Sequence, residues 1–130
     1  GLMCESFPNM FMITGPGSPS VLSNMIVSIE QHVDLVTDTL VHMRDRNLVV
    51  MEPTLEAEDD WVEEVNAAAY KTVYPAAASW YMGANIPGKP RIFMPYIGGV
   101  GVYRKICEKM VADGYKGFRF ESDANAAAAE

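Results

Sequence analysis

A glycine- and proline-rich stretch near the start of the chain, ITGPGSPSVLSNM at residues 13–25, has the residue types of a cofactor loop. An apolar run, closely spaced glycines and an amphipathic segment form the pattern in which a strand, a loop and a helix hold a dinucleotide phosphate. Here the spacing Gly15-x-Gly17-x-x-Ser20 places a serine where that fingerprint has its third glycine or alanine. The stretch therefore predicts a tight turn before a helix N-terminus. Whether this turn binds a phosphate is not decided by the pattern.

A second glycine pattern, Gly99-x-Gly101-x-x-Arg104, nearly matches the same fingerprint. Glu121 lies about 20 residues further on, where a ribose-binding acid would be found. However, Arg104 replaces the small third residue, and Pro95 interrupts the strand that should precede the loop. We therefore expect no dinucleotide-binding unit in the last third of the chain.

Residues 74–90, YPAAASWYMGANIPGKP, follow neither a helical nor a strand period and are rich in proline and glycine. A loop of this length inside a compact domain is usually functional or disordered, and its aromatic residues favour a function. Either Trp80 covers a ligand or it packs the loop against the domain, and both interpretations are open at this point.

Two further sets of side chains are of types that bind metals or transfer protons. The first is an acidic cluster without histidine or cysteine, which we interpret as a solvated helix face that complements the helix dipole: Glu56, Glu58, Asp59 and Asp60. The second is the pair His32 and His42, which stand alone in a predicted helix. We expect both histidines to be partly solvated, assign them no chemistry and predict no metal site.

The elements that would position these residues follow from periodicity. Residues 10–14 predict a buried strand, and apolar residues at 26, 29, 33, 36, 40 and 43 predict one face of a helix that ends near Asn47. An extended piece over 48–52 follows, and Thr54 is the expected N-cap of a second helix. That helix should bury Leu55, Val62, Val65 and Ala69. Residues 91–121 predict a strand, a glycine turn, a helix and a strand, so the fold class is α/β.

Length and charge narrow the function classes. A chain of 130 residues is one domain's worth, and its net charge of −7 argues against nucleic-acid binding. The sequence has neither an apolar run of roughly 18 residues for a membrane span nor a basic leader. Two cysteines, Cys4 and Cys107, are too few for a disulfide framework and favour the cytoplasm. We expect a piece of a longer protein, with 123–130 as a frayed tail.

Several stretches together resemble the C-terminal part of flavin-dependent Baeyer–Villiger monooxygenases, closest to the phenylacetone and steroid monooxygenase branch. They occur in the family's order and spacing over nearly all of residues 7–120: FPNMFMITGPGSPSVLSNM, VSIEQHVD, ASWYMGANIPGKPR, FMPYIGG and GYKGF. The resemblance implies that residues 1–122 are the C-terminal part of an FAD-binding monooxygenase domain, in a flavoprotein with two dinucleotide-binding domains. It implies that FAD, NADPH and O2 convert a ketone into an ester or lactone.

The resemblance also implies site residues. Gly15 and Gly17 would form a loop beside the flavin ring, while an upstream loop holds the FAD pyrophosphate. Met25 aligns with a residue whose backbone touches the flavin, and Trp80 matches the tryptophan of a mobile loop that covers NADP. The ketone pocket would be lined by five residues: Thr14, Ser20, Val21, Leu22 and Met94.

The family's two GxGxxG loops, its His-containing fingerprint and its catalytic arginine are absent from this sequence and are expected upstream of it. We therefore expect no catalytic residue in the chain and no activity from the chain alone, whose partner is the missing N-terminal part of the protein. Two alternatives are open. One is a related flavin monooxygenase that oxidises nitrogen or sulfur, and the other is a free-standing α/β binding module without chemistry.

Overall fold

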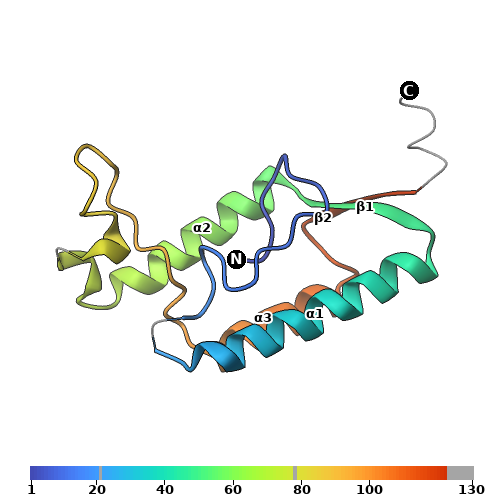
Figure 1. The fold of residues 1–130 in the computed structure, drawn as a ribbon, viewed down its shortest axis with the longest axis horizontal. Coiled ribbons are helices and arrows are strands. Elements are labelled where there is room, and N and C mark those ends of the chain that lie inside the picture. The colour runs from blue at the N-terminus through green and yellow to red at the C-terminus, as the bar shows by residue number, and fades with distance from the viewer. Residues whose placement is uncertain (21, 78, 123–130) are drawn as a thin grey trace.

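The computed structural model describes residues 1–20, 22–77 and 79–122, so the expected frayed tail at 123–130 lies outside the described residues. Helices α1 and α3 run side by side, α2 lies across from them, and the N-terminal segment passes between (Figure 1). The elements are α1 (Met25–Asp45), β1 (Leu48–Pro53), α2 (Leu55–Tyr70), the short 3-10 helices η1 (Tyr74–Ala76) and η2 (Trp80–Met82), α3 (Val100–Ala112) and β2 (Phe118–Ser122).

Helix α1 confirms the predicted helix but only part of the predicted buried face, of which Met43 is buried. Asn24 caps it by accepting from the Ile26 N–H at 2.9 Å, and Asn47, just beyond its end, has the left-handed φ of 54°. The buried residues are Ser28, Gln31, His32, Leu35, Thr39 and Met43. Of the predicted apolar face, Ile26, Val33 and Leu40 are exposed. The spacing of apolar residues identifies an apolar face of the helix, but whether that face is buried depends on which elements pack against it.

The two predicted strands outside the sheet are absent from the described residues. Residues 10–14 form turns and irregular backbone, with the Met12 N–H bonded to the Leu2 carbonyl at 2.7 Å. The stretch before Gly98 makes one isolated parallel bridge, between Pro19 and Tyr96. A strand requires a neighbour along its whole edge, and neither apolar run has one within the described chain.

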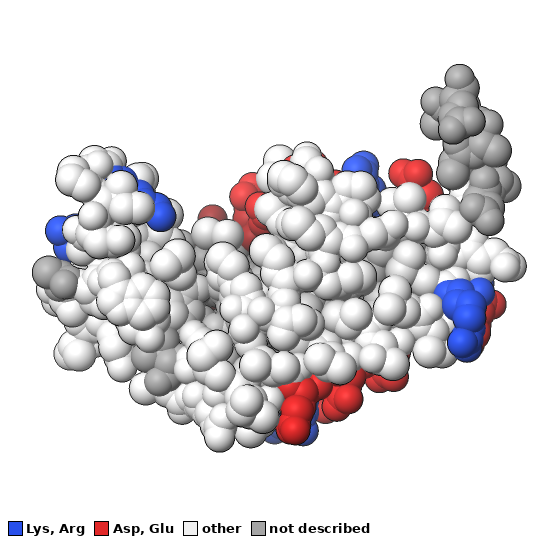
Figure 2. All heavy atoms as spheres, in the orientation of Figure 1, with Lys and Arg blue, Asp and Glu red and all other residues white. Residues whose placement is uncertain are grey.

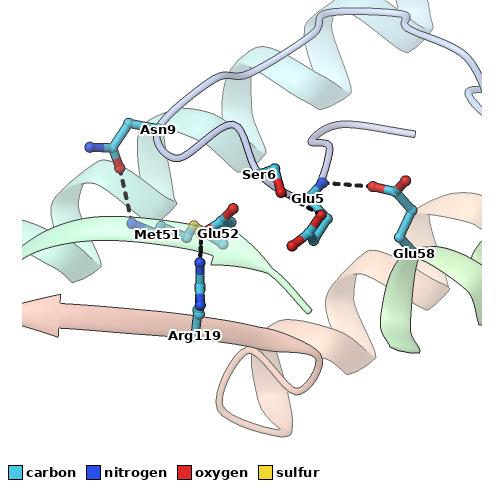
Figure 3. Close-up of polar contacts among 7 residues, drawn as sticks. All are labelled: Glu5, Ser6, Asn9, Met51, Glu52, Glu58 and Arg119. Carbon is cyan, nitrogen blue, oxygen red and sulfur yellow. Dashed lines mark hydrogen bonds and ion pairs between the residues drawn. The ribbon is translucent and has the colours of Figure 1, made fainter. Parts of the chain in front are cut away.

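The sheet consists of β1 and β2, paired antiparallel. Asn9 extends its edge, because the Asn9 N–H donates to the Met51 carbonyl and the Asn9 Oδ1 accepts from the Met51 N–H, both at 2.9 Å (Figure 3). Across the two strands Arg119 pairs with the buried carboxylate of Glu52. The prediction of an extended piece before Pro53 and of a final strand is thus confirmed.

Helix α2 begins as predicted, with the Thr54 hydroxyl accepting from the Ala57 N–H at 3.2 Å. Val65 and Ala69 are buried, whereas Leu55 and Val62 are exposed, so only half of the predicted buried side was right. In the acidic cluster, Glu56, Asp59 and Asp60 are exposed, and Glu58 accepts from the Glu5 N–H at 2.7 Å (Figure 3). Among the described residues, no group of three or more His, Cys, Asp or Glu is placed to hold a metal ion.

The core joins the three helices through Leu35, Val65, Tyr103 and Cys107, with Trp61 packed against them. Most of the face seen in Figure 2 is uncharged, and the acidic and basic groups lie toward its margins. Both cysteines are free thiols. In the part of the chain that the structure describes, no helix has the length and apolar character needed to cross a bilayer.

Candidate functional site

The glycine loop is a compact turn whose shape depends on both predicted glycines. Gly17 has φ +79°, and its N–H donates to the Met94 carbonyl at 2.7 Å. A Cβ at Gly17 would lie 2.7 Å from the Trp61 Nε1, and a Cβ at Gly15 would lie 2.8 Å from the Met12 Cβ. These glycines therefore permit close packing of the loop against its neighbours.

Trp61 fixes this loop from helix α2, and sequence reasoning did not single it out. Its indole N–H donates to the Gly17 carbonyl at 3.2 Å. Its ring packs against Tyr96 and Tyr103, with centroids 5.0 and 5.7 Å away. An aromatic residue in the acidic first half of a helix was the available signal, but its partner is 44 residues away in sequence.

Thr14 precedes the glycines with a φ of +54°, which is rare for a β-branched residue. The left-handed region costs an L-residue roughly 1–2 kcal/mol, so surrounding contacts must hold it there. One such contact is visible: the Thr14 N–H donates to the His32 Nδ1 at 3.0 Å.

His32 corrects the expectation of a partly solvated histidine, because it is fully buried. Its Nε2 lies 2.9 Å from the Tyr103 hydroxyl of α3. Burial lowers the pKa of His32 to about 4 and raises the pKa of Tyr103 above its ordinary value. Both groups are therefore neutral near pH 7. His42, by contrast, is half-buried, in line with the expectation, and its ring lies against that of Tyr115.

Met94 joins the glycine loop to the Trp80 loop. Its carbonyl accepts from Gly17 and its N–H donates to the Tyr81 carbonyl at 3.3 Å. Trp80 itself is 61 % exposed and stacks on Tyr81 with ring centroids 3.8 Å apart. The loop is irregular apart from η1 and η2, as predicted, and its tryptophan is presented at the surface.

The N-terminus of α1 suits a flat, partly apolar and electron-rich group. Its first turn carries no acidic residue, and the first N–H groups of a helix favour negative charge. Leu22, Met25 and Ile26 expose large apolar side chains beside it. The Ser23 and Ser28 hydroxyls are buried and have no partner among the described residues. The flavin contact that the resemblance implies at Met25 remains a prediction, because the structure describes only this surface and the first turn of the helix.

Of the predicted pocket residues that the structure describes, only Met94 lines the main apolar cavity. A cavity of about 570 Å³, lined mainly by apolar side chains, lies between the N-terminal segment, α2 and α3. Gly17 and Met94 line it, whereas Thr14, Ser20 and Leu22 are not among its lining residues. Val21 lies outside the described residues.

The proteins that resemble this chain in sequence and those that resemble it in fold are both monooxygenases. An acetone monooxygenase (methyl acetate-forming) of Gordonia sp. is 40% identical over 91% of this chain. A Baeyer–Villiger monooxygenase of Pseudooceanicola batsensis is 42% identical over 88% of it. The crystal structure of a cyclohexanone monooxygenase from Rhodococcus sp. bound to NADP+ superposes with a TM-score of 0.88 over 94% of this chain, at 38% identity.

The chain matches a segment of the Baeyer–Villiger monooxygenases. It spans about one fifth of their length, covering 22% and 21% of the two curated relatives and 23% of the solved structure. A solved steroid monooxygenase bound to NADP is 46% identical to this chain, with a TM-score of 0.83. The match covers 92% of this chain and 22% of the steroid monooxygenase chain. This similarity agrees with the predicted branch of the family. No family model matches the chain. The predicted resemblance and the α/β fragment of a larger flavoprotein are thus confirmed.

Proposed function

We propose that the chain is the flavin- and ketone-facing segment of a Baeyer–Villiger monooxygenase, a protein that inserts one oxygen atom of O2 next to a ketone carbonyl to give an ester or lactone. The observation that carries the proposal is the match of sequence and fold over about nine tenths of the chain to such enzymes. When bound, FAD and NADPH would supply the oxygen activation and the electrons.

In this proposal the chain's own residues bind, orient and exclude water. The turn at Gly15 and Gly17 presents the N-terminus of α1, and the backbone at Met25 contacts the flavin. Donors at a helix N-terminus stabilise negative charge that develops on an adjacent ring. Trp80 covers NADP, and Thr14, Ser20, Val21, Leu22 and Met94 line the ketone pocket.

The remaining walls of the site come from the part of the protein upstream of Gly1. This part would supply the dinucleotide-binding loops and the catalytic arginine, because the present sequence has neither. The exposed apolar side chains around Leu22 and Ile26 agree with a covering surface of this kind. The free thiols of Cys4 and Cys107 agree with a reducing compartment such as the cytoplasm.

One relative favours a second function. A phenazine N-monooxygenase of Lysobacter antibioticus is 34% identical over 95% of this chain. Oxidation of an aromatic nitrogen is therefore the competing proposal.

A product panel separates the two functions. The full-length protein is incubated with NADPH, O2 and matched sets of ketones, aromatic amines and thioethers, and the products are identified. We expect esters or lactones from ketones. N-oxides or S-oxides without any ester would overturn the proposal, and a protein that retains neither FAD nor NADP would favour the binding module.

A further inference from the structure

A buried chain of side-chain contacts links the glycine loop to two helices. His32 lies in α1, and both nitrogens of its ring make hydrogen bonds. Nδ1 accepts from the Thr14 N–H at 3.0 Å, and Nε2 lies 2.9 Å from the Tyr103 hydroxyl in α3. The imidazole and phenol rings also pack, with centroids 5.4 Å apart. One histidine thus connects three segments of the chain.

The contacts determine the tautomer of His32. Because an N–H donates to Nδ1, that nitrogen carries no proton, and the single ring proton is on Nε2. Nε2–H then donates to the Tyr103 oxygen. Tyr103 is almost fully buried, so this partner is not exchanged for water. The imidazole is held in one orientation, with its acceptor directed at the loop.

The loop has a specific need for that acceptor. Thr14 has a left-handed φ of +54°, a conformation that a β-branched residue leaves unless its surroundings hold it. The Thr14 N–H donates to Nδ1, so this bond anchors the peptide plane from which the left-handed turn starts. Immediately after Thr14 come Gly15 and Gly17, whose turn leads to the N-terminus of α1.

We propose that His32 is a positioning residue, whose Nδ1 holds Thr14 in the left-handed turn and so sets the place of the flavin-side loop, with Tyr103 orienting the ring. The inference rests on the proposed function, because the loop matters for catalysis only if it lies beside the flavin. His32 is fully buried, so it touches neither substrate nor solvent. Its effect on the reaction is exerted through the loop alone.

Two substitutions at His32 separate the acceptor from bulk and burial. The side-chain oxygen of His32→Asn lies close to where Nδ1 was, whereas the end group of His32→Gln reaches toward Tyr103 and leaves Thr14 without an acceptor. Thr39→Val is the matched control, because Thr39 is buried in the same helix and, among the described residues, its hydroxyl donates to the Leu35 carbonyl alone, at 2.7 Å.

The first readout is independent of activity. In the full-length protein, hydrogen exchange of the peptide that contains Thr14 should be about tenfold faster in His32→Gln, as expected for loss of one buried hydrogen bond. His32→Asn should restore most of the protection, and Thr39→Val should leave this peptide unchanged. Equal exchange in wild type and His32→Gln would overturn the proposal.

The second readout connects the loop to the reaction. Ester formed and hydrogen peroxide released are measured per NADPH consumed, together with the visible spectrum of the bound flavin. His32→Gln should lower the ester yield several-fold and shift the spectrum, with rescue in His32→Asn. Loss of thermal stability with unchanged yield and spectrum would show a merely structural role.

If His32→Gln does not fold, Tyr103→Phe gives the same test in milder form, since it frees the ring while keeping its bulk. Faster exchange at Thr14 supports the proposal, and unchanged exchange overturns it. The proposed function fails separately, when the wild-type full-length protein makes no ester.

Discussion

The state of single buried side chains determines much of what this segment can do, and His32 is the clearest case. Neither of its partners is near in sequence: Thr14 is 18 residues before it and Tyr103 is 71 after it. The pattern of lone histidines in a helix predicted partly solvated residues, which was wrong for His32 but agrees with the half-buried His42. The sequence does contain the signal that Trp80 lies in an irregular aromatic loop, because that signal is local.

The first prediction concerns pH. The pKa of His32 is about 4 in the folded protein against an ordinary 6.5, so the unfolded chain binds more protons between these values. Stability is fully present above pH 6.5 and falls as the pH is lowered toward 4, with a loss on the order of 2 kcal/mol at pH 5. Denaturant unfolding of the full-length protein at pH 7.5 and at pH 5 measures it. His32→Asn should show a smaller pH dependence, and identical dependence in both would contradict the assignment.

Trp80 gives the second prediction at this scale. In the full-length protein Trp80→Ala removes a flat ring and one N–H donor from a surface loop, so NADP binding should weaken about ten- to hundredfold, or roughly 1–3 kcal/mol. More of the NADPH consumed should end as hydrogen peroxide and less as ester, because the site is no longer closed to water. Titration of NADP and product counting provide the test. Wild-type values for both would leave Trp80 as a packing residue only.

At the level of elements, local patterns were sufficient for α1, α2, α3 and both strands of the sheet, because caps and periodicity are set by neighbouring residues. They were insufficient for residues 10–14, where an apolar run predicted a strand but has no strand partner among the described residues. They also failed for the buried face of α1, because burial depends on what packs against a helix. The glycine loop lies between these cases: its turn was predictable, whereas its contact with Trp61 was not.

The third prediction tests that contact. Gly17→Ala places a methyl group in a left-handed turn and against the held indole of Trp61, so stability should fall by about 2–4 kcal/mol. Gly88→Ala is the control, since Gly88 has a similar φ of +78° and open space around it. It should cost only about 1 kcal/mol. Denaturant midpoints of both variants measure the difference, and equal losses would show that Trp61 does not constrain the loop.

At the level of the whole molecule, the chain exposes the apolar face of α1 that its sequence predicts to be buried. Ile26, Val33 and Leu40 are each about half exposed or more. This is the arrangement expected of a segment whose cover is supplied by the rest of a longer protein. The family and the fold class could be predicted from the sequence because ordered motifs span nearly the whole chain. The ketone pocket stays a prediction, because among its described members only Met94 lines the apolar cavity, while Thr14, Ser20 and Leu22 do not.

The fourth prediction follows from this exposed face. The isolated 130-residue chain should associate, and Ile26→Gln with Leu40→Gln should shift it toward monomer, because contiguous apolar surface drives association. Light scattering after size-exclusion chromatography measures the mass. A monomeric wild-type chain with a sharp thermal transition would support a free-standing module.

The most direct test of the central claim uses labelled oxygen. The full-length protein is supplied with NADPH, a ketone and 18O2, and the product is analysed by mass spectrometry. We expect an ester or lactone that carries one 18O atom, with the second atom leaving as water. An ester without label, or label found only in N- or S-oxides, would contradict the account.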